Sequence, residues 1–359
     1  MRHQTPEAQQ AREAKLDALH ARLTESVSTL VSGDDWRRAL EFSARFRSRS
    51  FNNTMLIYLQ HYEAFQTGRV PSATPTYVAG FKQWQTLGRQ VMKGQSGYGI
   101  LAPVTARFAS HTPNSAESWR RLGRGERAQP GETTSTKLVG LRPAYVWDLT
   151  QTDGEPIPEP PAPTLLSGQA PLGLWEGLAA QVEAHGFTLK QVPDADAIGG
   201  ANGITDFSTH EVSVRSDMDE AAQVKTLAHE LGHVMLHSPD DRTGNDTTAA
   251  RDAVLHRGIA EVEAESVALM IGAAHGLDTS AYTIPYVSSW ASSVPGSDPV
   301  EVIQSTAERV RTTAVRVLDQ LDTVQVGNGD PPGLDRTATA HTAPERQQQP
   351  VVEPQVVGL

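Results

Sequence analysis

The stretch TLAHELGHVMLH, residues 226–237, constrains the fold more than any other part of this sequence. It contains His229, Glu230 and His233 in the order H-E-x-x-H, and it follows Ser216 and Asp217, which are candidate N-caps of a helix. Apolar positions recur along it with helical spacing: Val224, Leu227, Leu231 and Val234. The segment is therefore predicted to be a helix with two imidazoles on one face, as two ligands of one metal require, and a pair of core histidines is the alternative.

The chain contains no cysteine, so any metal must be bound by histidine and carboxylate side chains. A second predicted helix, RGIAEVEAESVALMIGAAHGLD (257–278), places Glu261 and Glu265 on one face, and Gly232 leaves room for another element to approach closely. Glu261 is the expected third ligand, which leaves a fourth position open, as in catalytic zinc sites. Glu265 is expected to accept the remaining ring proton of a ligating histidine. The alternative for both glutamates is a solvated acidic face.

Peptide hydrolysis is the chemistry that these residue types favour. Zinc lowers the pKa of a bound water and polarises a carbonyl, while Glu230, which is not a ligand, carries a proton from the water to the leaving amine. The segment EVSV (211–214) is interpreted as an edge strand that pairs with an extended substrate. The choice of an oxyanion donor stays open among three residues near the second metal helix: Tyr282, Tyr286 and His275.

The net charge of -11 is unevenly distributed along the chain. Residues 1–150 carry 20 Lys and Arg against 12 Asp and Glu, whereas residues 151–359 carry 11 against 30. A basic half in an acidic protein favours a polyanionic partner, and an ordinary solvated surface is the equal alternative. The sequence has no apolar run long enough for a membrane span and no secretory leader, so a cytoplasmic protein without a membrane partner is expected.

The basic half contains candidate contacts to single-stranded DNA. Residues 34–62 have helical periodicity, with an apolar stripe opposite an arginine-rich face. Arg47 interrupts the stripe, which predicts a bend or an end before it, or a side chain whose stem snorkels along the apolar surface. Residues 76–104 combine short strand-like runs, a short helix and turns. Their aromatic residues either stack on bases or belong to the core. The predicted DNA contacts are Arg38, Arg45, Arg49, Lys82, Trp84, Arg89 and Lys93.

Proline-rich and turn-forming stretches divide the chain. The predicted fold class is α+β, with a small α+β domain followed by a mainly helical domain that contains a small sheet. A long basic loop is expected within the first domain at 110–137. The predicted boundaries are a first domain at 1–150 with its core at about 30–150, a linker at 151–171, a second domain at 172–325 and a disordered tail at 326–359.

Three motifs in the first half, FNNTMLIYLQ, YVAGFKQWQTLGRQVMKGQSGYGILAPV and YVWDLTQTDGEPIP, resemble the N-terminal domain of ArdC-type antirestriction proteins over roughly residues 30–160. The resemblance implies a domain that coats single-stranded DNA, often DNA that enters a cell by plasmid transfer. The long loop at 110–137 departs from the family pattern.

The second half, from GITDFSTHEVSVRSDM through H-E-L-G-H to E-x-x-A-E, resembles the metallopeptidase domain of ImmA/IrrE and ArdC proteins over roughly 172–290. This resemblance implies a zincin-like fold, zinc on His229, His233 and Glu261, and Glu230 as the catalytic glutamate. The expected function is a DNA-associated, gluzincin-like zinc metalloendopeptidase that acts on a protein or peptide, in antirestriction, plasmid transfer or mobile-element regulation. The alternative is a non-proteolytic antirestriction protein that coats single-stranded DNA and has a structural or vestigial metal site.

Overall fold

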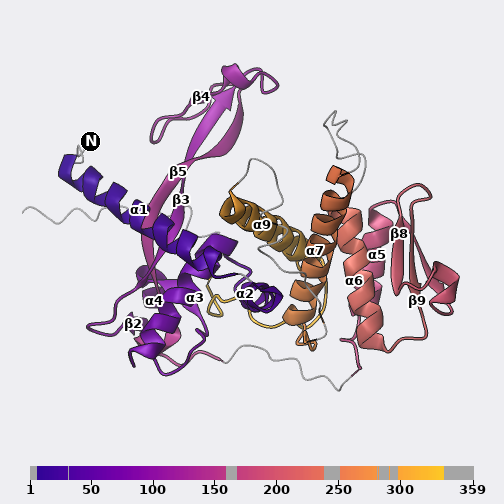
Figure 1. Cartoon of the computed structure of the whole chain (residues 1–359). Coiled ribbons are helices and arrows are strands. Elements are labelled where there is room, and N and C mark those ends of the chain that lie inside the picture. Colours follow the sequence, from indigo (N-terminus) through magenta and orange to yellow (C-terminus); the bar gives the residue numbers. More distant parts are fainter. Residues whose placement is uncertain are drawn as a thin grey trace, which may run out of the picture.

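The computed structural model describes residues 6–30, 32–158, 168–237, 251–280, 282, 291 and 298–334. Helices and three small sheets alternate along these residues (Figure 1), which confirms the mixed helix and strand content expected from the sequence. The finer expectation of two domains with a zincin-like second domain stays a prediction. None of the described helices combines the length and the apolar character that crossing a membrane requires.

Within its described residues, the first half contains four helices and two sheets. The helices are α1 (Pro6–Ser28), α2 (Gly33–Arg45), α3 (Phe51–Gln66) and α4 (Phe81–Thr86). Helix α2 begins with a capping box, because Ser32 and Asp35 each accept a hydrogen bond from the other's backbone N–H. It ends at its C-cap, Phe46, so the prediction of an end before Arg47 is confirmed.

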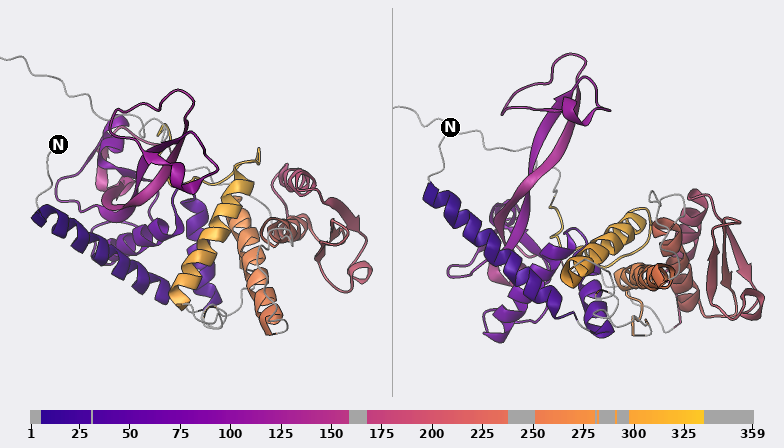
Figure 2. Two further views of the ribbon diagram at one scale, coloured as in Figure 1. Left: turned by 90° about the horizontal axis from the view of Figure 1, so that it is seen from above. Right: turned by 45° about the horizontal axis from the view of Figure 1, so that its top comes forward.

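The larger sheet is antiparallel, and it contains a long hairpin that projects away from the helices (Figures 1 and 2). The strand order is β1-β5-β3-β4, with bounds β1 (Val78–Gly80), β3 (Tyr98–Ser110), β4 (Arg120–Arg121) and β5 (Thr133–Asp148). The segment predicted as the loop 110–137 is therefore strand at both ends, because the β3–β5 pairing continues to Ser110 and Thr133. A smaller sheet joins β2 (Arg89–Val91) to β6 (Thr152–Gly154), so the start of the predicted linker pairs with the first half.

The described residues of the second half form four helices and a three-stranded sheet. Their bounds are α5 (Leu174–Ala184), β7 (Thr188–Val192), β8 (Gly203–Asp206), β9 (Glu211–Arg215), α6 (Glu220–Leu236), α7 (Arg251–Ala274) and α9 (Pro299–Leu318). Strand β9 is central, parallel to β7 and antiparallel to β8. The interpretation of 211–214 as an edge strand is therefore wrong. Its parallel partner β7 is separated from it in sequence by β8, so the pairing of β7 with β9 could not be read from the local sequence.

One hydrophobic cluster runs through both halves. Trp36 of α2 is fully buried, and its indole N–H donates to the hydroxyl of Ser266 on α7 at 2.9 Å. The same cluster contains Leu23 of α1, Val310 of α9 and Leu231 of α6. Burying a large apolar side chain contributes about 1.5–3 kcal/mol, so this shared core ties the basic half to the helices of the second half.

The first residues of the predicted disordered tail pack against the first half. The carbonyl of Gly329 accepts a hydrogen bond from the backbone N–H of Val78 at 2.9 Å, and the Asp330 carboxylate lies 3.4 Å from the Arg49 guanidinium. The prediction of a disordered tail at 326–359 is therefore wrong for residues 326–334, and its remaining residues, 335–359, lie outside the described residues.

Candidate metal centre

Helix α6 positions the H-E-x-x-H residues by local rules. Its N-cap is Asp219, whose carboxylate accepts from the backbone N–H of Ala222 at 2.8 Å, so the expected caps Ser216 and Asp217 are wrong by a few residues. The predicted apolar stripe is confirmed, since its members are all at most 4% exposed: Val224, Leu227, Leu231 and Val234. Burial of this stripe fixes the rotation of the helix and turns His229 and His233 toward α7.

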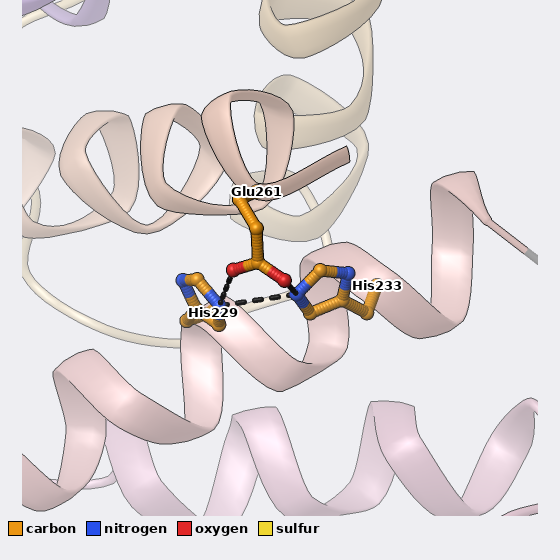
Figure 3. Close-up of side chains that lie close together, drawn as sticks. All are labelled: His229, His233 and Glu261. Carbon is orange, nitrogen blue, oxygen red and sulfur yellow. Dashed lines mark hydrogen bonds and ion pairs between the residues drawn. The ribbon is translucent and has the colours of Figure 1, made fainter. Parts of the chain in front are cut away.

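The two histidines and Glu261 converge on one point (Figure 3). The Nε2 atoms of His229 and His233 are 3.1 Å apart, and the Glu261 carboxylate oxygens lie 3.4 Å from the first and 3.6 Å from the second. Ligands at zinc distances of about 2.0–2.1 Å in a tetrahedron are about 3.3 Å from one another. These three side chains therefore fit a tetrahedral cation, and all three predicted ligands come together.

Close packing of α6 on α7 makes this convergence possible. A Cβ atom placed on Gly232 would stand 3.0 Å from the Ala264 Cα and 3.3 Å from its carbonyl oxygen, closer than ordinary packing allows. The absence of a side chain at Gly232 therefore lets the two helix backbones approach, as the sequence predicted. The approach occurs between the ligands, one residue from His233 and three residues from Glu261.

Glu230 lies beside the metal ligands but does not join them. Its side chain is buried, and the Thr205 hydroxyl of β8 donates to its Oε2 at 2.7 Å. Burial raises the pKa of Glu230, although His229 and Thr205 act in the opposite direction. The second oxygen, Oε1, faces Gly203, where a side chain would collide with it. A carboxylate with a raised pKa and one engaged oxygen suits a general base.

Glu265 occupies the position predicted for it. Its Oε2 lies 3.1 Å from His229 Nδ1, and its Oε1 pairs with Lys225 at 3.1 Å. Burial alone would lower the pKa of His229, but hydrogen bonding with Glu261 and Glu265 raises that pKa to about 9. The carboxylates therefore hold this imidazole protonated in the metal-free protein at neutral pH.

A second set of residues, not predicted from the sequence, lies behind His233. His237 Nδ1 lies 3.1 Å from His233 Nδ1, and His237 Nε2 lies 2.9 Å from Glu263 Oε2. The other Glu263 oxygen is 3.0 Å from the Arg309 guanidinium of α9. His237 follows His233 by four residues, as His233 follows His229, and this repeated helical spacing is the one sequence signal for His237. Arg309 gave no local signal.

The proposed oxyanion donors are engaged elsewhere. The buried Tyr282 hydroxyl donates to the Ala268 carbonyl at 3.2 Å, and burial raises its pKa. His275 is fully buried and bonds to the Ile271 carbonyl and the Thr323 hydroxyl. Both are structural in this position, and Tyr286 lies outside the described residues.

The predicted DNA contacts separate into two groups. Four of them are exposed: Arg38, Arg45, Lys82 and Lys93. Trp84 and Arg49 are buried, so their prediction as DNA contacts is wrong. Trp84 fills the small core near α4 and donates to the Trp147 carbonyl, while Arg49 bonds to the Val78 carbonyl and pairs with Asp330.

Arg89 is also used internally, because its guanidinium donates to the Thr152 hydroxyl and to carbonyls of the β6 segment. Arg89 is half-buried, and its role as a DNA contact stays a prediction. Among the aromatic residues weighed from the sequence, Phe81 is the exposed one at 46%, and Tyr98 is buried.

Comparison with known proteins then finds a family match in the first half. Residues 11–146 match the N-terminal domain of anti-restriction factor ArdC. The resemblance predicted for the first half is thus confirmed, with a match that begins in α1 rather than near residue 30. The likeness of the second half to ImmA/IrrE metallopeptidases stays a prediction.

Two further proteins are similar over most of the chain, one of them in two crystal structures. An uncharacterized protein of Bacillus anthracis is 23% identical over 339 residues, covering 88% of this chain and 52% of the relative, so the chain spans about half the length of that protein. Crystal structures of the antirestriction ArdC protein from the R388 plasmid are similar in metal-free form (21% identity, TM-score 0.44) and in Mn(II)-bound form (20% identity, TM-score 0.42). Each covers 76% of this chain and 84% of the ArdC chain.

Proposed function

We propose that this protein is an ArdC-type antirestriction protein that binds single-stranded DNA through its first half and hydrolyses peptide bonds at the metal centre of its second half. One observation supports the hydrolytic part above the others. Two Nε2 atoms lie 3.1 Å apart, each within 3.4–3.6 Å of one oxygen of the Glu261 carboxylate, and a second, buried carboxylate with a raised pKa, that of Glu230, lies beside them. A structural metal site needs no such neighbour.

His229, His233 and Glu261 would hold a divalent metal, and zinc is the ion that two imidazoles and one carboxylate favour. When bound, such an ion supplies Lewis acidity toward water and a peptide carbonyl. Glu230 takes a proton from the attacking water at Oε1, while Thr205 holds Oε2 in place. The same carboxyl then returns the proton to the leaving amine.

Strand β8 is the candidate platform for an extended substrate. It pairs with β9 along one edge, and two of its residues, Gly203 and Thr205, adjoin Glu230. A peptide added along the opposite edge would run past the metal ligands, with its backbone hydrogen-bonded to the strand. Strand β8 takes this role in place of the segment 211–214, because 211–214 is paired on both sides.

The DNA-binding part of the proposal depends on the exposed groups of the first half. Phe81 and Lys82 adjoin at the start of α4, and Phe81 packs edge-on against Trp147 with ring centroids 6.0 Å apart. An exposed ring beside cations suits base stacking, which tolerates any sequence. The excess of 20 basic over 12 acidic residues in 1–150 supports attraction to phosphates.

A second candidate function is antirestriction by DNA coating alone, without proteolysis. It is favoured by the extent of the family match, which lies in residues 11–146 and describes an anti-restriction factor. In that case the metal would stabilise the second half, and the buried Glu230 would serve packing alone.

The substitution Glu230→Gln tests the proposal, because it preserves size and the hydrogen bond from Thr205. A peptidase should lose turnover about 100-fold or more, with metal content and DNA affinity unchanged. The assay follows self-cleavage and cleavage of co-purified proteins, with and without single-stranded DNA. Protection of DNA from restriction endonucleases is measured in parallel. Cleavage that is equal in both proteins, with protection intact, contradicts the peptidase and leaves DNA coating as the function.

A further inference from the structure

We infer that His237, Glu263 and Arg309 form a positioning chain that fixes the tautomer and the orientation of His233. This chain joins three helices, because His237 is the C-cap residue of α6, Glu263 lies in α7 and Arg309 lies in α9. The inference deepens the proposed function and rests on the metal centre that it assigns to His229, His233 and Glu261.

The direction of each hydrogen bond follows from the far end of the chain. The Arg309 guanidinium is always charged and forms an ion pair with Glu263 Oε1 at 3.0 Å, and this pairing favours an ionised Glu263, whose Oε2 can only accept. His237 Nε2 must then carry the hydrogen that Glu263 Oε2 accepts at 2.9 Å. In a neutral imidazole this leaves a lone pair on His237 Nδ1.

That lone pair determines the state of His233. His237 Nδ1 lies 3.1 Å from His233 Nδ1, so His233 must donate from Nδ1 and keep the lone pair on Nε2. This Nε2 is the atom that faces His229 and Glu261. The chain therefore selects the tautomer in which His233 can bind a cation at the predicted position.

Burial makes the chain difficult to replace by water. The Glu263 side chain is 2% exposed, and the His237 side chain is 11% exposed. A buried carboxylate without a cation and a donor is costly, so Glu263 requires both Arg309 and His237. Arg309 itself is 54% exposed, which keeps the cation end accessible to mutation.

The two ligating histidines are supported differently. His229 contacts the carboxylate of Glu265 directly, and Lys225 pairs with that carboxylate. His233 has a second imidazole between itself and its carboxylate. As a consequence, α9 affects the metal centre through Arg309 although it contributes no ligand among the described residues.

Metal affinity of the full-length protein tests this chain. His237→Leu removes the acceptor, whereas His237→Asn keeps an acceptor oxygen near the position of Nδ1. Zinc dissociation constants are measured by competition with a chromophoric chelator, and apo-protein melting is recorded in parallel. We expect His237→Leu to weaken zinc binding by about 10-fold to 100-fold, and His237→Asn to weaken it less.

A matched control is His185→Leu, since His185 is the C-cap residue of α5 and its Nδ1 lies 2.8 Å from the Gln181 carbonyl. This control should bind zinc as the wild type does. The inference is overturned if the Leu and Asn variants lose equal zinc affinity and this loss follows their loss of stability as apo proteins. That result would mean that His237 contributes packing alone. Arg309→Gln, an exposed change, should weaken binding in the same direction even if the His237 variants fold poorly.

The tautomers give a readout that needs no metal. Long-range 1H–15N spectra of the apo protein should identify His237 as the Nε2–H form and His233 as the Nδ1–H form. The opposite tautomer at either residue overturns the chain. Wild-type protein that binds no metal contradicts the proposed metal centre, whereas normal zinc binding with unaffected variants contradicts only the positioning chain.

Discussion

Ala264 lies so close to Gly232 that a Cβ on the glycine would stand 3.0 Å from the Ala264 Cα atom. The contact is between backbones, so neither side can yield by a rotamer change. The metal ligands flank this crossing on both helices. A methyl group at position 232 should therefore separate α6 from α7 where Glu261 meets the two histidines.

The variant Gly232→Ala should be less stable despite a gain in helix propensity of about 1 kcal/mol. Overpacking typically costs about 1–3 kcal/mol, and the separated helices should also bind zinc more weakly. Thermal unfolding and zinc titration measure the two effects. The control is Gly177→Ala in α5, where the added methyl group meets only the flexible end of Leu321. Equal behaviour of the two variants would contradict the close-packing argument.

One zinc ion per chain is expected in the purified wild-type protein, bound by His229, His233 and Glu261. Elemental analysis should find it lost from the double variant His229→Ala, His233→Ala. Because imidazole and carboxylate ligands also accept manganese, reconstitution is compared with zinc and Mn(II). Stoichiometric metal in the double variant would place the ion elsewhere.

Zinc affinity should rise with pH from about 6.5 to about 9. Binding must displace the proton of His229, since its hydrogen bonds with Glu261 and Glu265 outweigh burial and raise its pKa to about 9 in the metal-free protein. One displaced proton changes the affinity by up to about tenfold per pH unit below that pKa. Chelator competition at several pH values measures the slope, and a flat profile would contradict it.

The stability of the metal-free protein has the opposite pH dependence. A raised pKa means that the contribution of His229 is complete below its ordinary pKa of 6.5 and is lost as the pH rises through about 9. Glu265→Gln removes one of the two carboxylates that raise the pKa. This variant should lose its stabilisation at a lower pH, as denaturant titrations at each pH would report.

Single-stranded DNA should bind the first half through exposed groups. Phe81→Ala should weaken binding by about 1–3 kcal/mol if the ring stacks on a base, and Lys82→Ala should reduce the salt dependence by about 0.7 in log–log slope. Fluorescence anisotropy with labelled single strands and duplex measures both. Lys190→Ala, an exposed change on β7, serves as the control. Binding that prefers duplex or ignores salt would contradict this interface.

The sequence by itself determined the helix of the H-E-x-x-H motif and the faces of its residues. Helical periodicity is local, so the buried stripe, the pair His229 and His233, and the pair Glu261 and Glu265 were all predictable from spacing. The close approach at Gly232 was also predictable, because glycine in a helix leaves space for a neighbour. Three motifs likewise indicated a resemblance to the ArdC N-terminal domain, which the family match confirms.

Only the tertiary structure decided which polar and aromatic side chains are exposed and so available to bind DNA. Trp84 and Arg49 are residue types that often contact DNA, yet both are buried here. Trp84 packs against β5, and Arg49 pairs with Asp330 of the segment after residue 326. Strand β9 became central because β7 pairs with it from a distant part of the chain. The chain from His233 through His237 and Glu263 to Arg309 needs three helices to meet. These outcomes depend on contacts between residues far apart in sequence, which local periodicity does not encode.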